Sequence, residues 1–292
     1  MTDIRLVSAS PWEQDLFVVG EFERMAHVLS VSKAAVLASV DTVLDYGGRR
    51  LALISAENPV IVAGAWARHG VCGYSLAGVQ LWQNESRSGV QQVTALAAGT
   101  VAVAYEKGPA VVLDGSSGEQ VSALPGVRGV HALTPSLSLL EGSGYMQLAD
   151  GNLQSVGDRI SLRSFGVLDA AADAEHVAVA EAGGPLRILT LAGVERATHL
   201  VPGGRVVAVA YEAGTGTWRA VSRVDREDDV HHELLRLSDD ADVLERQKLT
   251  DLIDAAWLRD GTALAYATPA GVRVRDDADG MAQQVGDIPP VP

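Results

Sequence analysis

A short strand and the turn after it recur seven times along this chain, and this repeat limits the possible folds more than any other feature. Each copy alternates in polarity and then stops at Gly, Asp, Asn or Ser, which are turn-forming residues. Further apolar strands precede most copies, as in residues 101–124, where turn residues at 106–109 and 114–118 separate three strands. Each repeat therefore predicts four short strands, of which the fourth has the weakest pattern. The copies begin at Val43, Val79, Val111, Met146, Leu186, Leu234 and Val272.

A four-stranded sheet of this length cannot bury both of its faces, so neighbouring repeats must cover one another. Many short strands with turns between them, and almost no helical periodicity, predict an all-β fold. We predict a single domain over residues 1–288, a seven-bladed β-propeller of four-stranded antiparallel blades, with six or eight blades as alternatives. The predicted blades span approximately residues 24–57, 58–92, 93–125, 126–156, 157–202, 203–247 and 248–285.

Two segments resemble parts of WD-repeat proteins. Residues 257–265 (WLRDGTALA) resemble the F-S-P-D-G-x-x-L-A turn of those repeats, and residues 113–119 (LDGSSGE) resemble their W-D-x-x-T-G-E segment. The Gly-His and Trp-Asp signatures are missing from nearly every repeat, so the chain is similar to a degenerate, bacterial-type WD-repeat-like β-propeller. The resemblance implies a rigid protein-binding platform or, less often, a hydrolase, lyase or oxidoreductase with its site in the central channel.

The two ends of the chain carry separate expectations. Residues 3–9 (DIRLVSA) predict a strand before the first repeat, and we expect it to complete the last blade so that no sheet edge stays open. Residues 243–258 have some helical spacing, so a short helix is the alternative to strands there. Residues 289–292 are expected to form a disordered tail.

Composition excludes some classes of function. A net charge of −14 argues against general binding to nucleic acids or anionic membranes, because both require a basic surface. The single cysteine, Cys72, cannot form an intrachain disulfide, and we expect a buried, inert thiol rather than a nucleophile. No signal peptide and no membrane span is recognisable, so we expect a cytoplasmic protein. Only three of the 23 basic residues are lysines, which is typical of a bacterium with a GC-rich genome.

No catalytic motif is present, and no cofactor site is predicted. The sequence lacks a phosphate-binding glycine loop, a G-x-S-x-G turn, an H-E-x-x-H helix and a cysteine pair. His231 and His232 follow an acidic run at 225–229, which suggests either a metal site or a solvated hairpin loop. The solvated loop is the preferred interpretation, because adjacent residues of a strand point to opposite faces.

Acidic residues recur after the second strand of several repeats, at Glu106, Glu141 and Glu181. Stacked blades would place them on one face, as an acidic rim for a basic partner or a cation; alternatively, they are simply hydrated turn residues. Trp66 and Tyr145 are candidate anchors, although Trp66, like Trp218 and Trp257, is predicted mainly in the core between blades. The predicted partner-binding residues are Asp41, Glu106, Lys107, Arg128, Glu141, Tyr145, Glu181, Arg205, Asp225, Arg226 and Asp251.

The sequence therefore predicts a non-enzymatic protein-interaction module, monomeric by itself. It would act as a scaffold or adaptor, or as an inhibitor of a basic protein such as a toxin. The alternative is a propeller enzyme, a hydrolase or lyase that is metal-assisted or metal-free, with its site at the mouth of the central channel.

Overall fold

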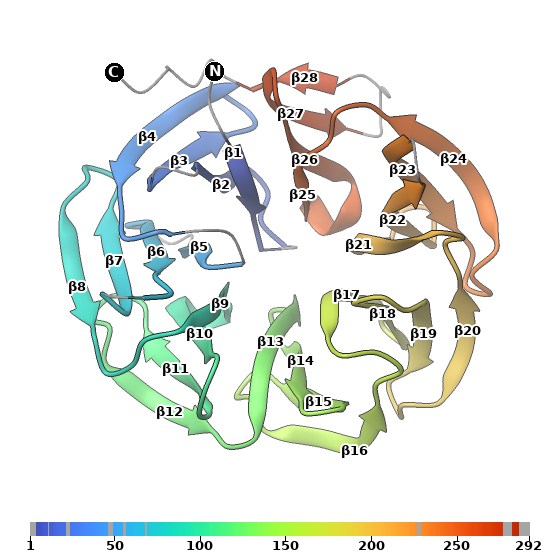
Figure 1. Cartoon of the computed structure of the whole chain (residues 1–292), viewed down its shortest axis with the longest axis horizontal. Coiled ribbons are helices and arrows are strands. Elements are labelled where there is room, and N and C mark those ends of the chain that lie inside the picture. Colours follow the sequence, from blue (N-terminus) through green and yellow to red (C-terminus); the bar gives the residue numbers. More distant parts are fainter. Residues whose placement is uncertain are drawn as a thin grey trace. The chain divides into compact units, whose positions relative to one another are not determined.

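A computed structural model describes residues 4–10, 12–21, 24–45, 49–54, 57–67, 69–226, 229–276 and 282–285. Its strands form seven four-stranded antiparallel sheets, each built from four consecutive strands (Figure 1). The chain divides into two compact units. Unit 1 comprises residues 1–130, 253–259 and 263–292, and unit 2 comprises residues 131–252 and 260–262.

Unit 1 contains four of the sheets. The first consists of β1 (Ile4–Ser8), β2 (Leu16–Glu21), β3 (Met25–Ser30) and β4 (Ala35–Asp41). The second consists of β5 (Leu51–Ile54), β6 (Val60–Gly64), β7 (Val71–Ser75) and β8 (Gln80–Asn84). The third consists of β9 (Val90–Ala95), β10 (Thr100–Tyr105), β11 (Ala110–Asp114) and β12 (Gln120–Leu124). The last consists of β25 (Asp254–Leu258), β26 (Ala263–Thr268), β27 (Gly271–Asp276) and β28 (Ala282–Gln284).

Unit 2 contains most of the remaining three sheets. The first consists of β13 (Val127–Thr134), β14 (Leu137–Gly142), β15 (Tyr145–Asp150) and β16 (Ser155–Ser161). The second consists of β17 (Val167–Ala172), β18 (His176–Glu181), β19 (Leu186–Thr190) and β20 (Glu195–His199). The third consists of β21 (Gly204–Glu212), β22 (Thr217–Arg226), β23 (Asp229–Leu237) and β24 (Val243–Leu249). Two short 3-10 turns, η1 (Ala97–Gly99) and η2 (Arg259–Gly261), are the helical elements of the described residues.

The turn chemistry of the repeats forms as the sequence predicts. After β11, the carboxylate of Asp114 accepts hydrogen bonds from the backbone N–H groups of Ser116 and Ser117, both at 2.9 Å. Hydrogen bonds from the Ser116 hydroxyl and then from Ser117 hold the pKa of Asp114 below its usual value. Gly118 closes the turn with φ of +71°, a conformation that glycine adopts without the steric cost of a Cβ.

Apolar side chains between neighbouring sheets build the core. In unit 1, Phe17 and Leu29 of the first sheet pack in one cluster with Leu258 and Val272 of the last sheet, and all four are fully buried. In unit 2, Trp218 is fully buried in a cluster that joins the sheet β17–β20 to the sheet β21–β24. Trp257 is also buried, as predicted, whereas Trp66 is 39% exposed.

Polar side chains link the first strands of neighbouring sheets. In unit 1, Asp254 of β25 accepts a hydrogen bond from the backbone N–H of Val7 in β1, at 2.8 Å. In unit 2, Asp169 of β17 accepts one from the N–H of Val209 in β21, at 2.9 Å. These carboxylates provide acceptors for N–H groups at sheet edges that would otherwise lack a strand partner.

Two expectations about the chain's organisation need correction. Strand β1 pairs with β2, and the last sheet consists of β25 to β28, so closure of the last blade by residues 3–9 is not observed. The first sheet begins at Ile4 rather than near residue 24, because β1 supplies its first strand. Residues 243–249 and 254–258 form β24 and β25, which confirms the predicted strands over the alternative of a short helix. The predicted tail at 289–292 lies outside the described residues. Within the described part of the chain, no helix has the length and apolar character that crossing a membrane requires.

Candidate functional site

The connection between β16 and β17, residues 162–166, presents the most exposed large apolar side chain of the described residues. Phe165 is 89% exposed. Burial of an aromatic side chain is among the largest favourable contributions to protein association, so Phe165 is the strongest candidate for a contact among the exposed apolar side chains. We call residues 162–166 the Phe165 loop.

A buried carboxylate holds the backbone of the Phe165 loop. Glu181, the last residue of β18, is fully buried. Its Oε2 atom accepts hydrogen bonds from the backbone N–H groups of Arg163 at 2.6 Å and Ser164 at 2.8 Å. Two N–H groups bound by one charged acceptor fix the direction of the chain immediately before Phe165.

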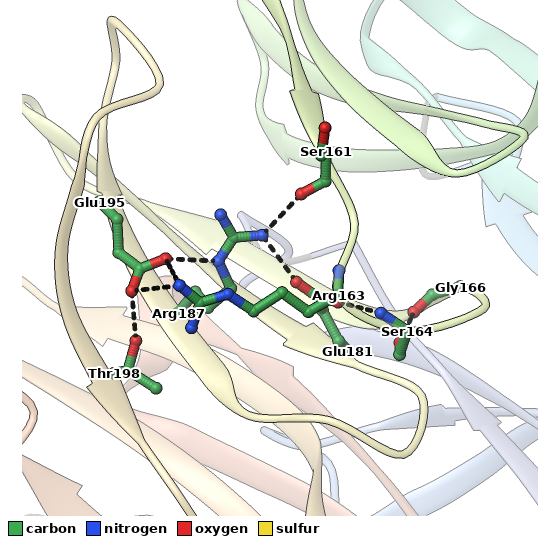
Figure 2. Close-up of polar contacts among 8 residues, drawn as sticks. All are labelled: Ser161, Arg163, Ser164, Gly166, Glu181, Arg187, Glu195 and Thr198. Carbon is green, nitrogen blue, oxygen red and sulfur yellow. Dashed lines mark hydrogen bonds and ion pairs between the residues drawn. The ribbon is translucent and has the colours of Figure 1, made fainter.

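Two arginines and a second glutamate complete this network (Figure 2). The guanidinium of Arg187 donates to Glu181 Oε1 at 2.8 Å, to Glu195 Oε2 at 2.9 Å and to the Ser161 carbonyl at 3.0 Å. Arg163 pairs with the same Glu195 at 2.8 Å. Partial burial raises the pKa of Glu195, but hydrogen bonds from Thr198 and Arg187 outweigh this and leave it lowered. The two glutamates and two arginines thus pair among themselves.

Backbone contacts anchor both ends of the Phe165 loop. The N–H of Leu162 donates to the Gly144 carbonyl at 3.1 Å, and the N–H of Ala182 donates to the Gly166 carbonyl at 2.8 Å. Inside the loop, the Ser164 hydroxyl also donates to the Gly166 carbonyl, at 3.2 Å. The loop is therefore tied to the β14–β15 turn and the β18–β19 turn, and Phe165 projects from a fixed backbone.

Glu141 and Tyr145, both predicted as partner-binding residues, lie close to this loop. The N–H of Val167, which follows the loop, donates to Glu141 Oε2 at 3.2 Å, and His131 lies 3.4 Å from the same atom. The ring of Tyr145 packs under the guanidinium of Arg159 at 4.3 Å. Glu141 and Glu181 thus bind the backbone on the two sides of Phe165, with Glu181 beneath the surface, and Tyr145 pairs with Ser161 just before the loop.

The other predicted residues of unit 2 lie elsewhere. Asp225, near the end of β22, pairs with Arg223 at 2.8 Å and with Arg205 at 3.4 Å. The side chain of Arg226 lies outside the described part, and Asp251 is exposed in the connection after β24 with φ of +57°.

The histidine pair lies in a strand rather than in the predicted solvated loop, and His232 is buried. His231 and His232 belong to β23, and His231 lies 3.6 Å from Glu233. Burial, followed by the nearby Arg223, lowers the pKa of His232 to about 4. Among the residues that the structure describes, which exclude Glu227 and Asp228, no three His, Cys, Asp or Glu side chains gather as a metal site would require.

A small pocket opens beside the long β22–β23 hairpin of unit 2. It has a volume of about 80 Å³. Its charged lining groups are Glu233 and Arg246, which pair with each other at 3.7 Å. The remaining lining residues are His199, Val201, Pro202, Val224 and Leu235. Since Glu233 and Arg246 already pair with each other, neither charge is directed at a ligand in this pocket.

The predicted residues of unit 1 do not form one cluster around an anchor. Asp41 ends β4 and pairs with Arg24 at 3.5 Å, with both side chains mostly exposed. Glu106 and Lys107 are exposed in the turn after β10, and Arg128 is exposed on β13.

Trp66 of unit 1 is held in a way that resembles the Phe165 loop. The carboxylate of Asp45 accepts the N–H of Trp66 at 2.7 Å and pairs with Arg50 at 2.7 Å. The Arg50 guanidinium lies 5.1 Å from the indole centre, so the ring is packed on an arginine as well as partly exposed.

Sequence reasoning missed Phe165 and the role of Glu181. The apolar pattern of residues 164–171 (SFGVLDAA) predicts a strand over the whole segment, but β17 begins only at Val167. The available signal was Gly166 directly after Phe165, because a glycine beside a large apolar residue favours a turn over a strand. The hydrogen bonds from the backbone to Glu181 join residues 17 and 18 positions apart and have no local sequence signature.

Comparisons with known proteins support the fold. No protein-family model and no curated protein sequence matches this chain. Solved structures do match: U3-55K superposes with a TM-score of 0.67 at 13% identity, over 92% of this chain and 89% of that one. BamB from Moraxella catarrhalis superposes with a TM-score of 0.60 at 13% identity, over 93% and 84%. The computationally designed Ika8 protein superposes with a TM-score of 0.60 at 16% identity, over 96% and 86%.

These observations define the fold class. U3-55K and BamB are propeller proteins, and each matches more than nine-tenths of this chain. Together with the seven four-stranded antiparallel sheets, they confirm the predicted all-β, seven-bladed β-propeller. Identities of 13–16% establish this likeness for the fold alone.

Proposed function

We propose that this protein is a non-enzymatic protein-interaction module whose binding surface is centred on the Phe165 loop. The observation that carries the proposal is a phenylalanine that is 89% exposed on a loop whose backbone is bound at several points. The propeller fold is consistent with such a module, since its loops are presented from rigid sheets.

The energetics of association favour this arrangement. A few buried aromatic or arginine side chains supply most of the affinity of a typical protein interface. Ordering a flexible loop on binding costs free energy, and a loop that is already ordered avoids much of this cost. The hydrogen bonds from Arg163 and Ser164 to Glu181 provide that order before any partner arrives.

The predicted role of acidic residues changes in this proposal. Glu181 is fully buried, and Glu141 is bound to Val167 and His131. Among Glu106, Glu141 and Glu181, only the side chain of Glu106 is exposed; Glu141 is half-buried and Glu181 is buried. We propose that Glu141 and Glu181 support the loop and that Phe165 supplies the contact, with a basic partner no longer required.

The cellular compartment belongs to the proposal as well. Cys72 is the single cysteine of the chain and a buried, free thiol. A single free cysteine is typical of proteins in reducing compartments, where disulfides are rare, so we propose that this protein is cytoplasmic.

A quantitative affinity pull-down tests the proposal. The tagged protein and its Phe165→Ala variant are compared on extracts of the source organism, with recovered proteins measured by mass spectrometry. Leu200→Ala is the matched control, because Leu200 is also in unit 2 and 67% exposed. We expect at least one protein to be recovered by the wild type and Leu200→Ala but depleted at least tenfold with Phe165→Ala. Equal recovery by all three proteins would refute the proposal.

A further inference from the structure

We infer that Ser39 is a nucleophile activated by His27 and Glu21, and that it accepts the acyl group of an activated ester. This inference goes beyond the proposed function, because it concerns a different site in unit 1 and describes one transfer to the chain rather than enzymatic turnover. The three side chains come from consecutive strands of the first sheet, β2, β3 and β4 (Figure 1). Their register, contacts and burial carry the inference.

The strand register places the three side chains on one face of the sheet. His27 of β3 lies directly opposite Ser39 of β4 and directly opposite Val19 of β2. Opposite residues of antiparallel strands project to the same face, with Cβ atoms about 4.5–5.5 Å apart. Glu21 lies two residues after Val19, so it projects to that face as well and is the diagonal neighbour of His27.

The imidazole of His27 bridges the other two side chains. Its Nδ1 atom lies 2.8 Å from the hydroxyl oxygen of Ser39, and its Nε2 atom lies 3.2 Å from Oε1 of Glu21. In the described part of the chain, neither Nε2 nor Oε1 has another hydrogen-bond partner, so these two atoms are available to each other. An acceptor at Nε2 favours the tautomer with its proton there and leaves Nδ1 to accept the proton of Ser39.

Burial prepares the imidazole for this role. The side chains of His27 and Glu21 are 2% and 4% exposed, whereas Ser39 is exposed on the edge strand β4. Burial lowers the pKa of His27 although the charge of Glu21 opposes it, so the imidazole is neutral at neutral pH. A neutral imidazole accepts a proton, and the adjacent carboxylate stabilises the imidazolium that forms. The nucleophile is thus accessible to a reagent while its base is shielded from water.

The reaction balances with an ester as the co-reactant. The Ser39 oxygen bonds to the acyl carbon while its proton passes to Nδ1 of His27. The bond between the acyl carbon and the alcohol oxygen then breaks, and the proton passes from His27 to the leaving alcohol. The products are an O-acyl serine and the free alcohol, without any change of oxidation state.

Ser116 of the same unit is a matched internal control. It is also exposed, and its hydroxyl donates a hydrogen bond to the Asp114 carboxylate at 2.6 Å. The pKa of Asp114 is below its usual value, so this carboxylate is a far weaker base than a neutral imidazole. If exposure and a hydrogen-bonded acceptor were sufficient for reactivity, Ser116 would react as fast as Ser39.

A fluorophosphonate tests the nucleophile on the full chain. This probe is a phosphorus analogue of an activated ester: the serine oxygen displaces fluoride, and the stable adduct is located by peptide mapping with mass spectrometry. We expect Ser39 to be labelled at least tenfold faster than Ser116. His27→Gln should reduce the rate at Ser39 at least tenfold and leave the rate at Ser116 unchanged, with circular dichroism as the check on folding.

The role of Glu21 as a positioning residue has its own readout. The charge of Glu21 raises the pKa of His27 against the effect of burial. Glu21→Gln removes this charge, so the pH at which labelling of Ser39 is half-maximal should move to a lower value. A merely structural role would change the amount of folded protein but not this midpoint, and an unchanged midpoint would overturn the role assigned to Glu21.

Two results would overturn the activation of Ser39. One is labelling of Ser39 no faster than that of Ser116, and the other is an unchanged rate at Ser39 in a folded His27→Gln variant. Since His27 is buried, a second measurement uses the wild type alone: proton transfer to the imidazole predicts slower labelling of Ser39 in D2O than in H2O. Equal rates in the two solvents would also overturn the inference.

Discussion

Replacing Glu181 by alanine tests whether the buried carboxylate holds the Phe165 loop. The substitution removes the acceptor of two backbone N–H groups and one partner of the ion pair with Arg187. Breaking a buried ion pair costs about 3–5 kcal/mol, and a buried donor without an acceptor costs about 1–3 kcal/mol. Arg187 keeps Glu195 and the Ser161 carbonyl, so we expect the lower part of this range, about 3–4 kcal/mol.

Glu181→Gln separates the hydrogen bonds from the charge. The glutamine oxygen can still accept the N–H groups of Arg163 and Ser164, but its amide group no longer neutralises Arg187. We expect a loss of about 2 kcal/mol, smaller than for alanine. Glu119→Ala is the matched control, because Glu119 is exposed and its loss changes the net charge by the same amount; we expect less than about 0.5 kcal/mol.

Urea unfolding followed by circular dichroism measures these differences, and hydrogen exchange locates them. In Glu181→Ala, the amides of Arg163 and Ser164 should exchange faster while those of the core strand β18 remain protected. The reasoning is refuted if Glu181→Ala loses less than about 1 kcal/mol, or if the two loop amides exchange at unchanged rates.

Three further predictions concern other parts of the molecule. Cys72 is fully buried and burial raises the pKa of its thiol, so a thiol reagent at pH 8 should react with it only after unfolding; prompt reaction of the folded protein would contradict this. The pKa of His232 is about 4 in the folded protein and 6.5 in an exposed histidine, so the unfolded chain binds more protons than the folded one between these pH values. The free energy of unfolding should therefore fall as the pH drops from about 6.5 to about 4, with a slope of about 1 kcal/mol per pH unit at most. His232→Gln should flatten this slope and His69→Gln, at an exposed position, should not; equal slopes in urea titrations would contradict the assignment. Asp254→Ala removes the acceptor of the Val7 N–H and should cost about 1–3 kcal/mol in thermal or urea unfolding, with no change counting against the link.

Turn chemistry made much of the fold predictable. Segments such as 111–118 carry their own structural information, because Asp114 binds the backbone two and three residues ahead and Gly118 adopts a positive φ. Such contacts are local, so they survive in a single sequence without homologues. The seven repeats and the four-stranded unit followed from these turns.

The start of the first blade shows where local patterns mislead. The segment at Val43 resembles the strand of a repeat, and both Val43 and Leu44 are buried. They lie in the connection between β4 and β5 rather than in a strand, because an apolar pair can fill the space between sheets in a loop. A buried apolar pair in a loop therefore has the same sequence pattern as part of a strand.

The candidate site was predictable only in part. Glu141 and Glu181 were selected by their position after a strand, and Tyr145 as an aromatic anchor. Glu141 and Glu181 bind the backbone on the two sides of Phe165, and Tyr145 pairs with Ser161 just before the loop. The direction in which each side chain points depends on contacts such as those with residues 14 to 26 positions away in the chain, which no local pattern encodes. The same limitation hid Phe165, since an apolar residue in sequence is more often buried than exposed.

The pairing of β1 with β2 has a consequence for synthesis on the ribosome. Every sheet consists of consecutive strands, so each can form its hydrogen bonds soon after its own segment emerges. The first sheet nevertheless packs Phe17 and Leu29 against Leu258 and Val272, which are made more than 200 residues later. At about 5–20 residues per second, this apolar face waits on the order of 10–50 s for its cover. The nascent chain thus carries a formed sheet with one apolar face uncovered until Leu258 and Val272 are made, and a chaperone would protect it during this interval.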